Sequence, residues 1–289
     1  PIVLIGKFIK YIEDMSRARA KNNKQLKYYG AGMVIIVCLV SFGVPAFLLY
    51  IAWKVKSLFH IVNIIILWTT IAARSLKDES MKVYLALQNG DILLARKMTS
   101  YIVGRDTKAL QEEELIRATV ETVAENTCDG VIAPLLFAFI GGAPLAMMYK
   151  GVNTMDSMVG YVSPPFTHIG YFPAKVDDIF NFIPARITGL LMCLIAPLMG
   201  ESIIRSMKIM IRDRKNHKSP NCAYPEAAVA GILKVQLGGD NTYFNTLIKK
   251  PTLGDKIREL TGKDIVLANK IMFLTEFLFV AIVIVLRRL

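Results

Sequence analysis

The chain contains 289 residues, of which 54% are apolar and only 20% are charged, and this apolar share exceeds the usual range of soluble domains. The formal net charge is +12, but the basic residues do not interleave with stacking aromatic residues, so nucleic acid is not predicted as a partner. The basic excess lies in residues 1–30, with seven Lys and Arg against two acids, and in residues 205–270, with thirteen against six. The positive-inside bias of membrane proteins explains this distribution and predicts that both segments are cytoplasmic.

Long apolar segments divide the chain. Charged residues are absent from residues 28–53, 57–73, 130–149 and 187–200, and Glu276 is the only one in 271–286. A helix needs roughly 20 apolar residues to cross the hydrocarbon of a bilayer. We therefore predict an all-α polytopic membrane protein, with four to five membrane-embedded helices plus amphipathic and cytoplasmic helices, in a single domain over residues 1–289. A large soluble helical protein is the alternative, but an uncharged run such as 28–53 is hard to bury in a chain of this length.

The polar sequence between the apolar segments predicts further helices. Residues 1–27 have the pattern of a basic amphipathic surface helix, and residues 75–103 that of two helices separated by Asn89-Gly90-Asp91, a strong turn signal. A second break at Gly104-Arg105-Asp106-Thr107 precedes a helix from Glu112 to about Thr127, with Asp106 or Thr107 as its expected cap. We see no alternation of polar and apolar residues that predicts strands.

The first candidate site lies on this helix. Glu121, Glu125 and Asp129 are spaced four residues apart, so they share one face if the helix continues to Asp129, and Asn126 adjoins them. Like charges at this spacing repel each other, which calls for Mg²⁺ or a basic group to offset them. The alternative is a solvated helix face paired by Arg117.

Two further clusters follow the next apolar segments. Lys150, Asn153 and Asp156 place a cation, an amide and a carboxylate within seven residues, where the alternative is an interfacial loop with a snorkelling lysine. Asp177 and Asp178 precede another apolar segment, and carboxylates in that position are costly unless a cation lies nearby.

Asp178, Asn181 and Arg186 are predicted to share one helix face distorted by Pro184. An ordinary helix cap is the alternative to metal or phosphate binding by this group.

A fourth cluster is basic. It contains Arg212, His217, Asn221 and Glu226, and its cations suit a phosphate group. A positive-inside loop followed by a helix, with Pro225 and Glu226 in its first turn, would have the same pattern.

Five runs of residues occur in order along the chain: IVGRDT (102–107), ETVAENTCDGVIAP (121–134), GGAPLAMMYKGVNTMDSMVGY (141–161), VDDIFNFIPARITGLL (176–191) and SPNCAYPEAAVAGILKVQLGG (219–239). Together they closely resemble the CbiB/CobD family of cobalamin biosynthesis, the adenosylcobinamide-phosphate synthases. The match extends from about Ile2 to Gly254. Family members usually begin with an apolar helix ahead of this point, so the resemblance implies a further membrane helix before Pro1. Cys128 stands where a Ser is common.

The resemblance implies a ligase that forms an amide bond. It would join a propionate carboxylate of adenosylcobyric acid, a corrinoid, to aminopropanol or aminopropanol O-phosphate, and it would consume ATP. A carboxylate is a poor electrophile until one oxygen becomes a good leaving group, so an acyl phosphate is our mechanistic hypothesis. Phosphoryl transfer requires Mg²⁺ and cationic side chains. Membrane lipid is an expected partner, together with a second copy of the chain or other enzymes of the pathway.

The resemblance also implies roles for the clusters described above. Predicted catalytic residues are Glu121, Glu125, Asp129 and Lys150. Predicted metal ligands are Glu125, Asp129, Asp156, Asp177 and Asp178. Predicted to bind substrate or phosphate are Arg105, Asp106, Asn126, Asn153, Arg186, Arg212, Asn221 and Glu226. The site is expected to face the cytoplasm.

Two other classes of protein compete with this interpretation. A membrane transporter of an organic anion would also have acids near the membrane and helices broken by Gly and Pro, but the long polar segments at 74–129 and 205–270 favour an enzyme. A non-catalytic scaffold for other cobalamin enzymes would gain nothing from several clusters of acids beside apolar segments.

Overall fold

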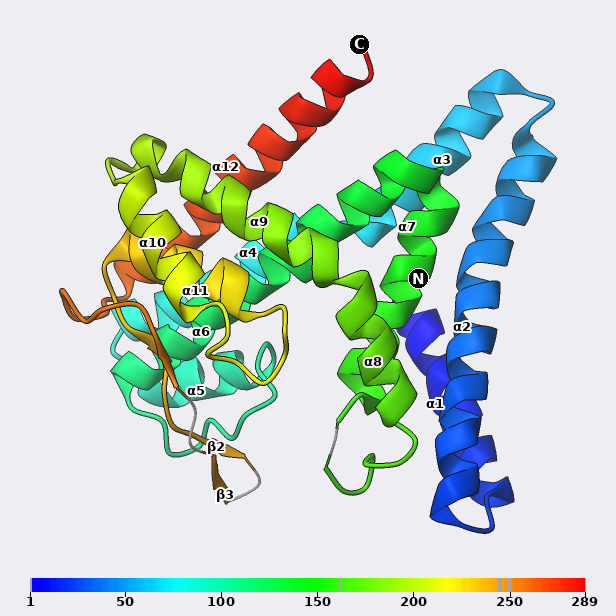
Figure 1. Cartoon of the computed structure of the whole chain (residues 1–289), viewed down its shortest axis with the longest axis horizontal. Helices are drawn as coiled ribbons and strands as arrows, with labels where there is room; N and C mark the ends of the chain where they lie inside the picture. The colour runs from blue at the N-terminus through cyan, green and yellow to red at the C-terminus, as the bar shows by residue number, and fades with distance from the viewer. Residues whose placement is uncertain (1, 162, 244–245, 249–250, 289) are drawn as a thin grey trace. The chain divides into compact units, whose positions relative to one another are not determined.

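The computed structural model describes residues 2–161, 163–243, 246–248 and 251–288, so Pro1 lies outside the described residues. The described chain is dominated by α-helices (Figure 1), which confirms the predicted all-α class. It divides into two compact units: unit 1 comprises Pro1–Ile71 and Ala133–Asn181, and unit 2 comprises Ala72–Ile132 and Phe182–Leu289.

Unit 1 is a bundle of helices. They are α1 (Ile2–Arg19), α2 (Asn23–Ala52), α3 (Lys56–Thr70), α7 (Ala133–Val159) and α8 (Tyr171–Phe180). The prediction of one helix over residues 1–27 is wrong, because α1 ends at Arg19. Asn22 begins the next helix by accepting a hydrogen bond at its side-chain oxygen from the Gln25 N–H, at 2.8 Å. Such an N-cap satisfies a backbone donor that the helix itself leaves open.

The core of unit 1 forms where α1, α2 and α7 lie side by side (Figure 1). Ile9, Met33, Val37 and Met155 are fully buried there. Close packing of these side chains stabilises the contact between the three helices. α7 changes direction at its glycine pair, where Gly142 adopts a φ of +68°, a backbone conformation that residues with a Cβ rarely tolerate.

Unit 2 contains the remaining elements. Its helices are α4 (Ala73–Gln88), α5 (Ile92–Ser100), α6 (Glu112–Thr127), α9 (Phe182–Ile195), α10 (Ile203–Asp213), α11 (Ala223–Leu233) and α12 (Lys263–Leu286). A π-helical turn, Cys128–Ile132, continues α6, and a 3₁₀ turn, Ala196–Met199, continues α9. The described residues of this unit also form four short strands: β1 (Leu237–Gly238), β2 (Asn241–Tyr243), β3 (Thr246–Ile248) and β4 (Thr252–Leu253).

The strands form two antiparallel pairs, β1 with β4 and β2 with β3. In the first pair Leu237 lies opposite Leu253, and both side chains are buried. The expectation that the chain contains no strands is therefore wrong at this place. Strands of two or three residues are too short to produce a visible alternation, which explains why the sequence did not reveal them.

The predicted helix breaks are confirmed, but one predicted cap is not. α4 and α5 are separated by the Asn89-Gly90-Asp91 turn, and Asp91 caps α5. α6 is capped by Gln111, which exchanges side-chain and backbone hydrogen bonds with Glu114. This is a capping box, so neither Asp106 nor Thr107 has the capping role expected of it.

A second expectation is also overturned. α8 ends at Phe180 and α9 begins at Phe182, so Asp178, Asn181 and Arg186 do not share the face of one helix. Asn181 is the C-cap of α8, where its backbone N–H donates to the Asp177 carbonyl oxygen. The helix boundary therefore separates the two acids from Arg186.

Five helical segments of the described chain are long and apolar enough to cross a membrane: Asn23–Ala52, Lys56–Gln88, Glu112–Val159, Phe182–Met199 and Lys263–Leu286. They cover the five apolar runs identified in the sequence, apart from Trp53 and Gly200. This confirms the predicted class, a polytopic α-helical membrane protein.

Candidate functional site

The predicted carboxylate stripe lies on α6 and its π-helical continuation. α6 does not stop at Thr127, because the π turn Cys128–Ile132 carries the helix past Asp129. Single π-helical turns inserted in α-helices are frequent at functional sites. The continuous helix carries both Glu125 and Asp129, and both act electrostatically on the same neighbour, the Cys222 thiol.

A cavity of about 180 Å³ opens beside this stripe in unit 2. Its polar lining comes from α6, from the loop before α6, from the 216–226 segment and from β1: Arg105, Glu121, Thr122, Glu125, Asn216, His217, Glu226 and Gly238. Four of these residues, Arg105, Glu121, Glu125 and Glu226, were predicted as site residues. The fold thus brings together residues that are more than 100 positions apart in the sequence.

Glu121 binds two other groups that line this cavity. Its Oε2 accepts a hydrogen bond from Arg105 Nη2, and its Oε1 accepts one from the Gly238 N–H at 2.7 Å. The Arg105 and Glu121 side chains are only 9% and 7% exposed, so the pair is buried. Glu121 therefore fixes a positive charge and a backbone segment at the cavity wall, in addition to any contact it makes with a substrate.

Glu125 belongs to a second group at the cavity. Its Oε1 accepts a hydrogen bond from the Cys222 thiol, at 3.0 Å from Sγ. Asp129 and Glu226 also act electrostatically on that thiol. Carboxylates from α6, the π turn and α11 therefore converge around the start of α11. This concentration of negative charge suits a cationic ligand.

Arg186 lies next to the same segment. Its Nη1 donates a hydrogen bond to Asn221 Oδ1 at 3.2 Å, and its guanidinium lies over the rings of Phe182, at 3.4 Å, and Tyr224, at 4.5 Å. Stacking of this kind holds a guanidinium plane in one orientation. Asn221 directly precedes Cys222 in the chain. The structure thus brings the predicted residues Arg186 and Asn221 together and connects them to the carboxylate group.

Arg212 is held by acids. It donates hydrogen bonds to both carboxylate oxygens of Asp213, at 2.7 and 2.8 Å, and to Asp255 Oδ1 at 2.8 Å. Burial opposes the ionisation of Asp213, but Arg212 and the Gly254 N–H hold the pKa of that carboxyl below its usual value. Arg212 therefore joins α10 to the loop at residue 255, and its role as a phosphate clamp stays a prediction.

Two predicted residues of unit 2 have local backbone partners. Asp106 Oδ1 accepts a hydrogen bond from the Lys108 N–H at 3.0 Å, and Asn126 Nδ2 donates one to the Thr122 carbonyl oxygen at 3.0 Å. Asp106 also lines a separate cavity together with Arg105.

The other predicted residues belong to unit 1. Lys150 is buried on α7, and Asn153 and Asp156 are half-buried on the same helix. On α8, Asp177 Oδ2 accepts from Asn181 Nδ2 at 2.9 Å, and Asp178 faces Lys175 at 3.5 Å. Asp177 is buried, whereas its neighbour Asp178 forms an ion pair with an exposed lysine, because adjacent helical residues point in different directions.

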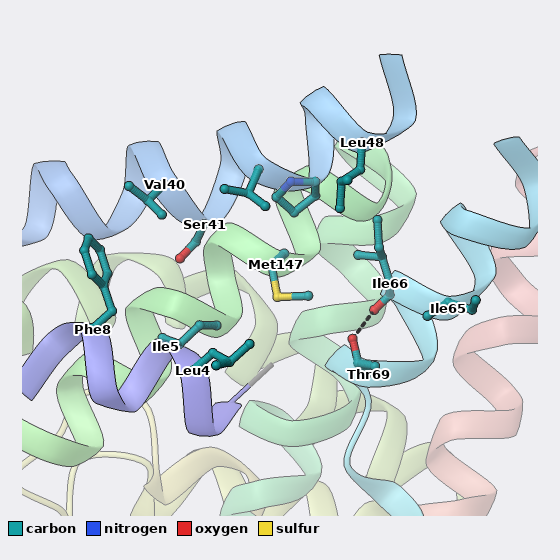
Figure 2. A pocket seen from close by; sticks show the side chains of 12 residues that line it. Leu4, Ile5, Phe8, Val40, Ser41, Leu48, Ile65, Ile66, Thr69 and Met147 are labelled. Carbon is teal, nitrogen blue, oxygen red and sulfur yellow. Dashed lines mark hydrogen bonds between the residues drawn. The ribbon is translucent and has the colours of Figure 1, made fainter. Parts of the chain in front are cut away.

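Unit 1 also has a cavity, but an apolar one. It measures about 410 Å³ and is lined by side chains of α1, α2, α3 and α7, among them Phe8, Val40, Ile66 and Met147 (Figure 2). The Thr69 hydroxyl donates to the Ile66 carbonyl oxygen at 2.7 Å. None of the described residues that line this cavity titrates near neutral pH. It offers no acid or base beside its Ser41 and Thr69 hydroxyls, so it is not our candidate for the chemistry.

Some residues at the unit 2 cavity had no role assigned from the sequence. His217 Nδ1 accepts a hydrogen bond from the Ser219 N–H at 3.0 Å, and Asn216 Nδ2 donates to the Thr252 carbonyl oxygen at 3.1 Å. His217 stands in the basic cluster noted above, which is the only signal that could have found it. Thr122 and Gly238 carry no chemical signal of their own.

The family model described as CobD/Cbib protein matches residues 1–272. The chain belongs to the CobD/CbiB family. This membership gives it a role in cobalamin biosynthesis.

Individual members of the CobD/CbiB family match nearly the whole chain. The cobalamin biosynthesis protein CobD of Clostridium tetani is 56% identical over 285 residues, which cover 98% of this chain and 89% of that protein. CobD of Geobacter metallireducens is 50% identical over 265 residues, with 90% and 81% covered. The cobalamin biosynthesis protein CbiB of Salmonella typhimurium is 42% identical over 288 residues, with 99% and 90% covered. No solved structure gives a significant match.

The environment of Cys222 in this CobD/CbiB protein leads to a testable pH dependence. Burial, followed by the negative charges of Glu125, Glu226 and Asp129, raises the pKa of the Cys222 thiol well above its usual value. The thiolate is the reactive form, so alkylation of Cys222 by N-ethylmaleimide should be slow at pH 7.5 and should accelerate as the pH rises. Glu125→Gln removes one of these charges, lowers the pKa and should increase the rate several-fold at fixed pH.

Mass spectrometry of the Cys222 peptide measures this rate separately from the other cysteines. Glu112→Gln is the matched control, because Glu112 is exposed in the first turn of the same helix. Rapid alkylation at pH 7.5 in the unchanged protein would contradict the described environment of the thiol.

Proposed function

We propose that this protein is an ATP-dependent ligase. It joins a propionate carboxylate of adenosylcobyric acid to the amine of aminopropanol or aminopropanol O-phosphate, and the product is adenosylcobinamide or its phosphate. The observation that carries this proposal is the unit 2 cavity, which combines the carboxylates of Glu125 and Glu226 with the fixed positive charge of Arg105. Asp129 adds a third negative charge near the adjoining Cys222 thiol.

The carboxylates suit the amine substrate. An aliphatic amine is protonated at neutral pH, so it arrives as an ammonium ion that a cluster of carboxylates attracts. It must lose a proton before its nitrogen can attack. Glu125 faces the cavity and is proposed as the group that orients the ammonium and accepts that proton. Asn126 and Glu226 are proposed to hold the amine in place.

The cations suit the carboxylate substrate and the phosphates. In the first step a propionate oxygen attacks the γ-phosphorus of ATP, the bond to the β,γ-bridging oxygen breaks, and ADP leaves. In the second step the amine attacks the acyl carbon, the C–O bond to phosphate breaks, and inorganic phosphate leaves. Negative charge accumulates on oxygen in both steps, and guanidinium groups stabilise such charge. Arg105 and Arg186 are proposed for this role.

Mg²⁺ fits the same residues as a partner of the nucleotide. Within the described residues, no three His, Cys, Asp or Glu side chains are placed to hold a metal by themselves. Mg²⁺ in phosphoryl-transfer sites usually needs only one or two carboxylates, because substrate phosphates and water complete its shell. Asp129 would hold it, because Glu125 is assigned to the proton of the amine, and when bound it would neutralise charge on the transferred phosphate. Metal binding by Asp156, Asp177 and Asp178 stays a prediction.

The distribution of basic residues along the chain indicates which side of the membrane the site faces. The basic segments 1–30 and 205–270 carry the positive residues that membrane proteins retain on the cytoplasmic side, and 205–270 contributes His217, Cys222 and Glu226 to the site. We therefore propose that the site opens to the cytoplasm, where ATP is present.

An assay with the purified full chain in detergent tests the function. With adenosylcobyric acid, aminopropanol phosphate, ATP and Mg²⁺, we expect one amide product and one ADP for each amine consumed, measured by mass spectrometry and nucleotide chromatography. The same assay with aminopropanol shows which amine is preferred. If neither amine is converted to an amide and proteoliposomes take up an organic anion, the proposed ligase function is wrong. The protein would then be a transporter.

A further inference from the structure

A second cavity in unit 2 is also lined by Arg105. It measures about 480 Å³ and is formed by α5 and the loop that precedes α6. Four of the residues that line it are cations, Arg96, Lys97, Arg105 and Lys108, and one is an acid, Asp106. This excess of positive charge selects for an anion with several negative charges.

The cavity has a fixed frame. Arg96 Nε donates to the Leu110 carbonyl oxygen at 2.9 Å, and the Thr107 hydroxyl donates to the Arg96 carbonyl oxygen at 3.0 Å. The acid at the rim, Asp106, accepts the Lys108 N–H, which directs one of its oxygens to the backbone. These bonds tie the loop to α5, so the cations are held around one space.

Two lysines at this cavity are available to a ligand. Lys97 and Lys108 are both exposed, and within the described part of the chain neither forms an ion pair with a carboxylate. Unpaired ammonium groups at a cavity can bind phosphate oxygens without first losing another partner. The alternative explanation is a solvated basic surface. That alternative does not explain why both lysines and two arginines line the same cavity.

Arg105 connects this cavity to the carboxylate cavity, because it lines both. Its guanidinium is buried and bound to Glu121, so its position is fixed. A molecule with a chain of phosphates that occupies the basic cavity would therefore direct one end toward Arg105, beside the residues to which we assign the chemistry.

We propose that this basic cavity binds the polyphosphate chain of the nucleotide, with Lys97 and Lys108 as ligands of phosphate oxygens. The chain has no glycine-rich phosphate loop of the G-x-x-x-x-G-K-[ST] type, in which backbone N–H groups would hold the phosphates. Cationic side chains can bind phosphate oxygens instead, and four line this cavity. The inference rests on the proposed consumption of ATP and specifies where the nucleotide binds.

The test measures binding without turnover. Equilibrium dialysis of the purified full chain with radiolabelled ATP gives its Kd, and a parallel series with aminopropanol phosphate gives that of a phosphate monoester. Lys97→Gln and Lys108→Gln should each weaken ATP binding roughly tenfold, because each removes a charge-assisted hydrogen bond, and should leave the binding of aminopropanol phosphate unchanged. Lys77→Gln is the matched control, since Lys77 is an exposed lysine of α4 outside this cavity, and it should change neither Kd.

The outcomes separate this proposal from the proposed function. An ATP affinity equal to that of the unchanged protein in both lysine variants would overturn the nucleotide cavity, even if amide formation proceeds. A loss of affinity for aminopropanol phosphate alone would overturn it as well, because the cavity would then bind the phosphate of the amine substrate. If the variants lose ATP affinity but the unchanged protein forms no amide, the nucleotide cavity stands and the ligase function fails.

Discussion

Glu125→Gln is expected to remove the ligase activity and leave the protein folded. The amide oxygen of Gln can still accept the hydrogen bond of the Cys222 thiol, whose Sγ lies 3.0 Å from Glu125 Oε1. The substitution also relieves repulsion with Asp129 and Glu226, so the stability should not fall. A neutral amide cannot accept a proton from the amine or attract an ammonium ion. Loss of such a group typically lowers the rate by about 10²–10⁴-fold.

The measurement is the steady-state rate of amide formation, together with the thermal unfolding midpoint in detergent. Glu112→Gln on the same helix is the control and should retain full activity, because Glu112 is exposed and does not line the cavity. Activity of the Glu125→Gln variant equal to that of the control would exclude Glu125 from the chemistry.

Glu121→Leu is expected to have the largest effect on stability. It leaves the guanidinium of Arg105 buried without its carboxylate and removes the acceptor of the Gly238 N–H. Breaking one side of a buried ion pair costs about 3–5 kcal/mol. The free energy of unfolding, measured by denaturant titration in detergent, should fall by roughly this amount.

A second substitution separates the charge from the backbone bond. When Arg105→Leu is added, the uncompensated charge disappears, and most of the loss should be recovered. The Gly238 N–H stays without its acceptor, which costs about 1–3 kcal/mol. Glu79→Ala, which breaks an exposed pair with Lys82, should change stability by only about 0–1 kcal/mol. If Glu121→Leu alone were as mild as this control, Glu121 would not be the anchor that the structure indicates.

The sequence by itself determined the membrane class and the positions of most helices. Runs without charge, such as residues 28–53, are costly anywhere except in a bilayer or a large core, so their meaning does not depend on the rest of the chain. The turn at Asn89-Gly90-Asp91 and the four-residue spacing of Glu121 and Glu125 are likewise local properties, and the structure reproduces both.

Residue preferences alone did not predict the end of a helix where more than one residue could cap it. Asp106 and Thr107 are good cap residues, yet Gln111 caps α6 because Glu114 completes the reciprocal pair. The expected common face of Asp178 and Arg186 fails for a similar reason, since the helix boundary at Asn181 divides them. In both places the sequence supplied suitable residues, and the choice among them depended on neighbours several positions away.

Only the tertiary structure decided which residues meet at the site. Glu121 binds Arg105 and Gly238, which are 16 and 117 positions away, and Glu125 binds Cys222, which is 97 positions away. Periodicity specifies which face of a helix a residue occupies, but it contains nothing about the partner that covers that face. The loop before α6 supplies Arg105, and the packing of α11 and β1 against α6 brings Cys222 and Gly238 to it. For this reason the sequence gives the carboxylate stripe, whereas the cavity and the fixed charge of Arg105 follow from the fold.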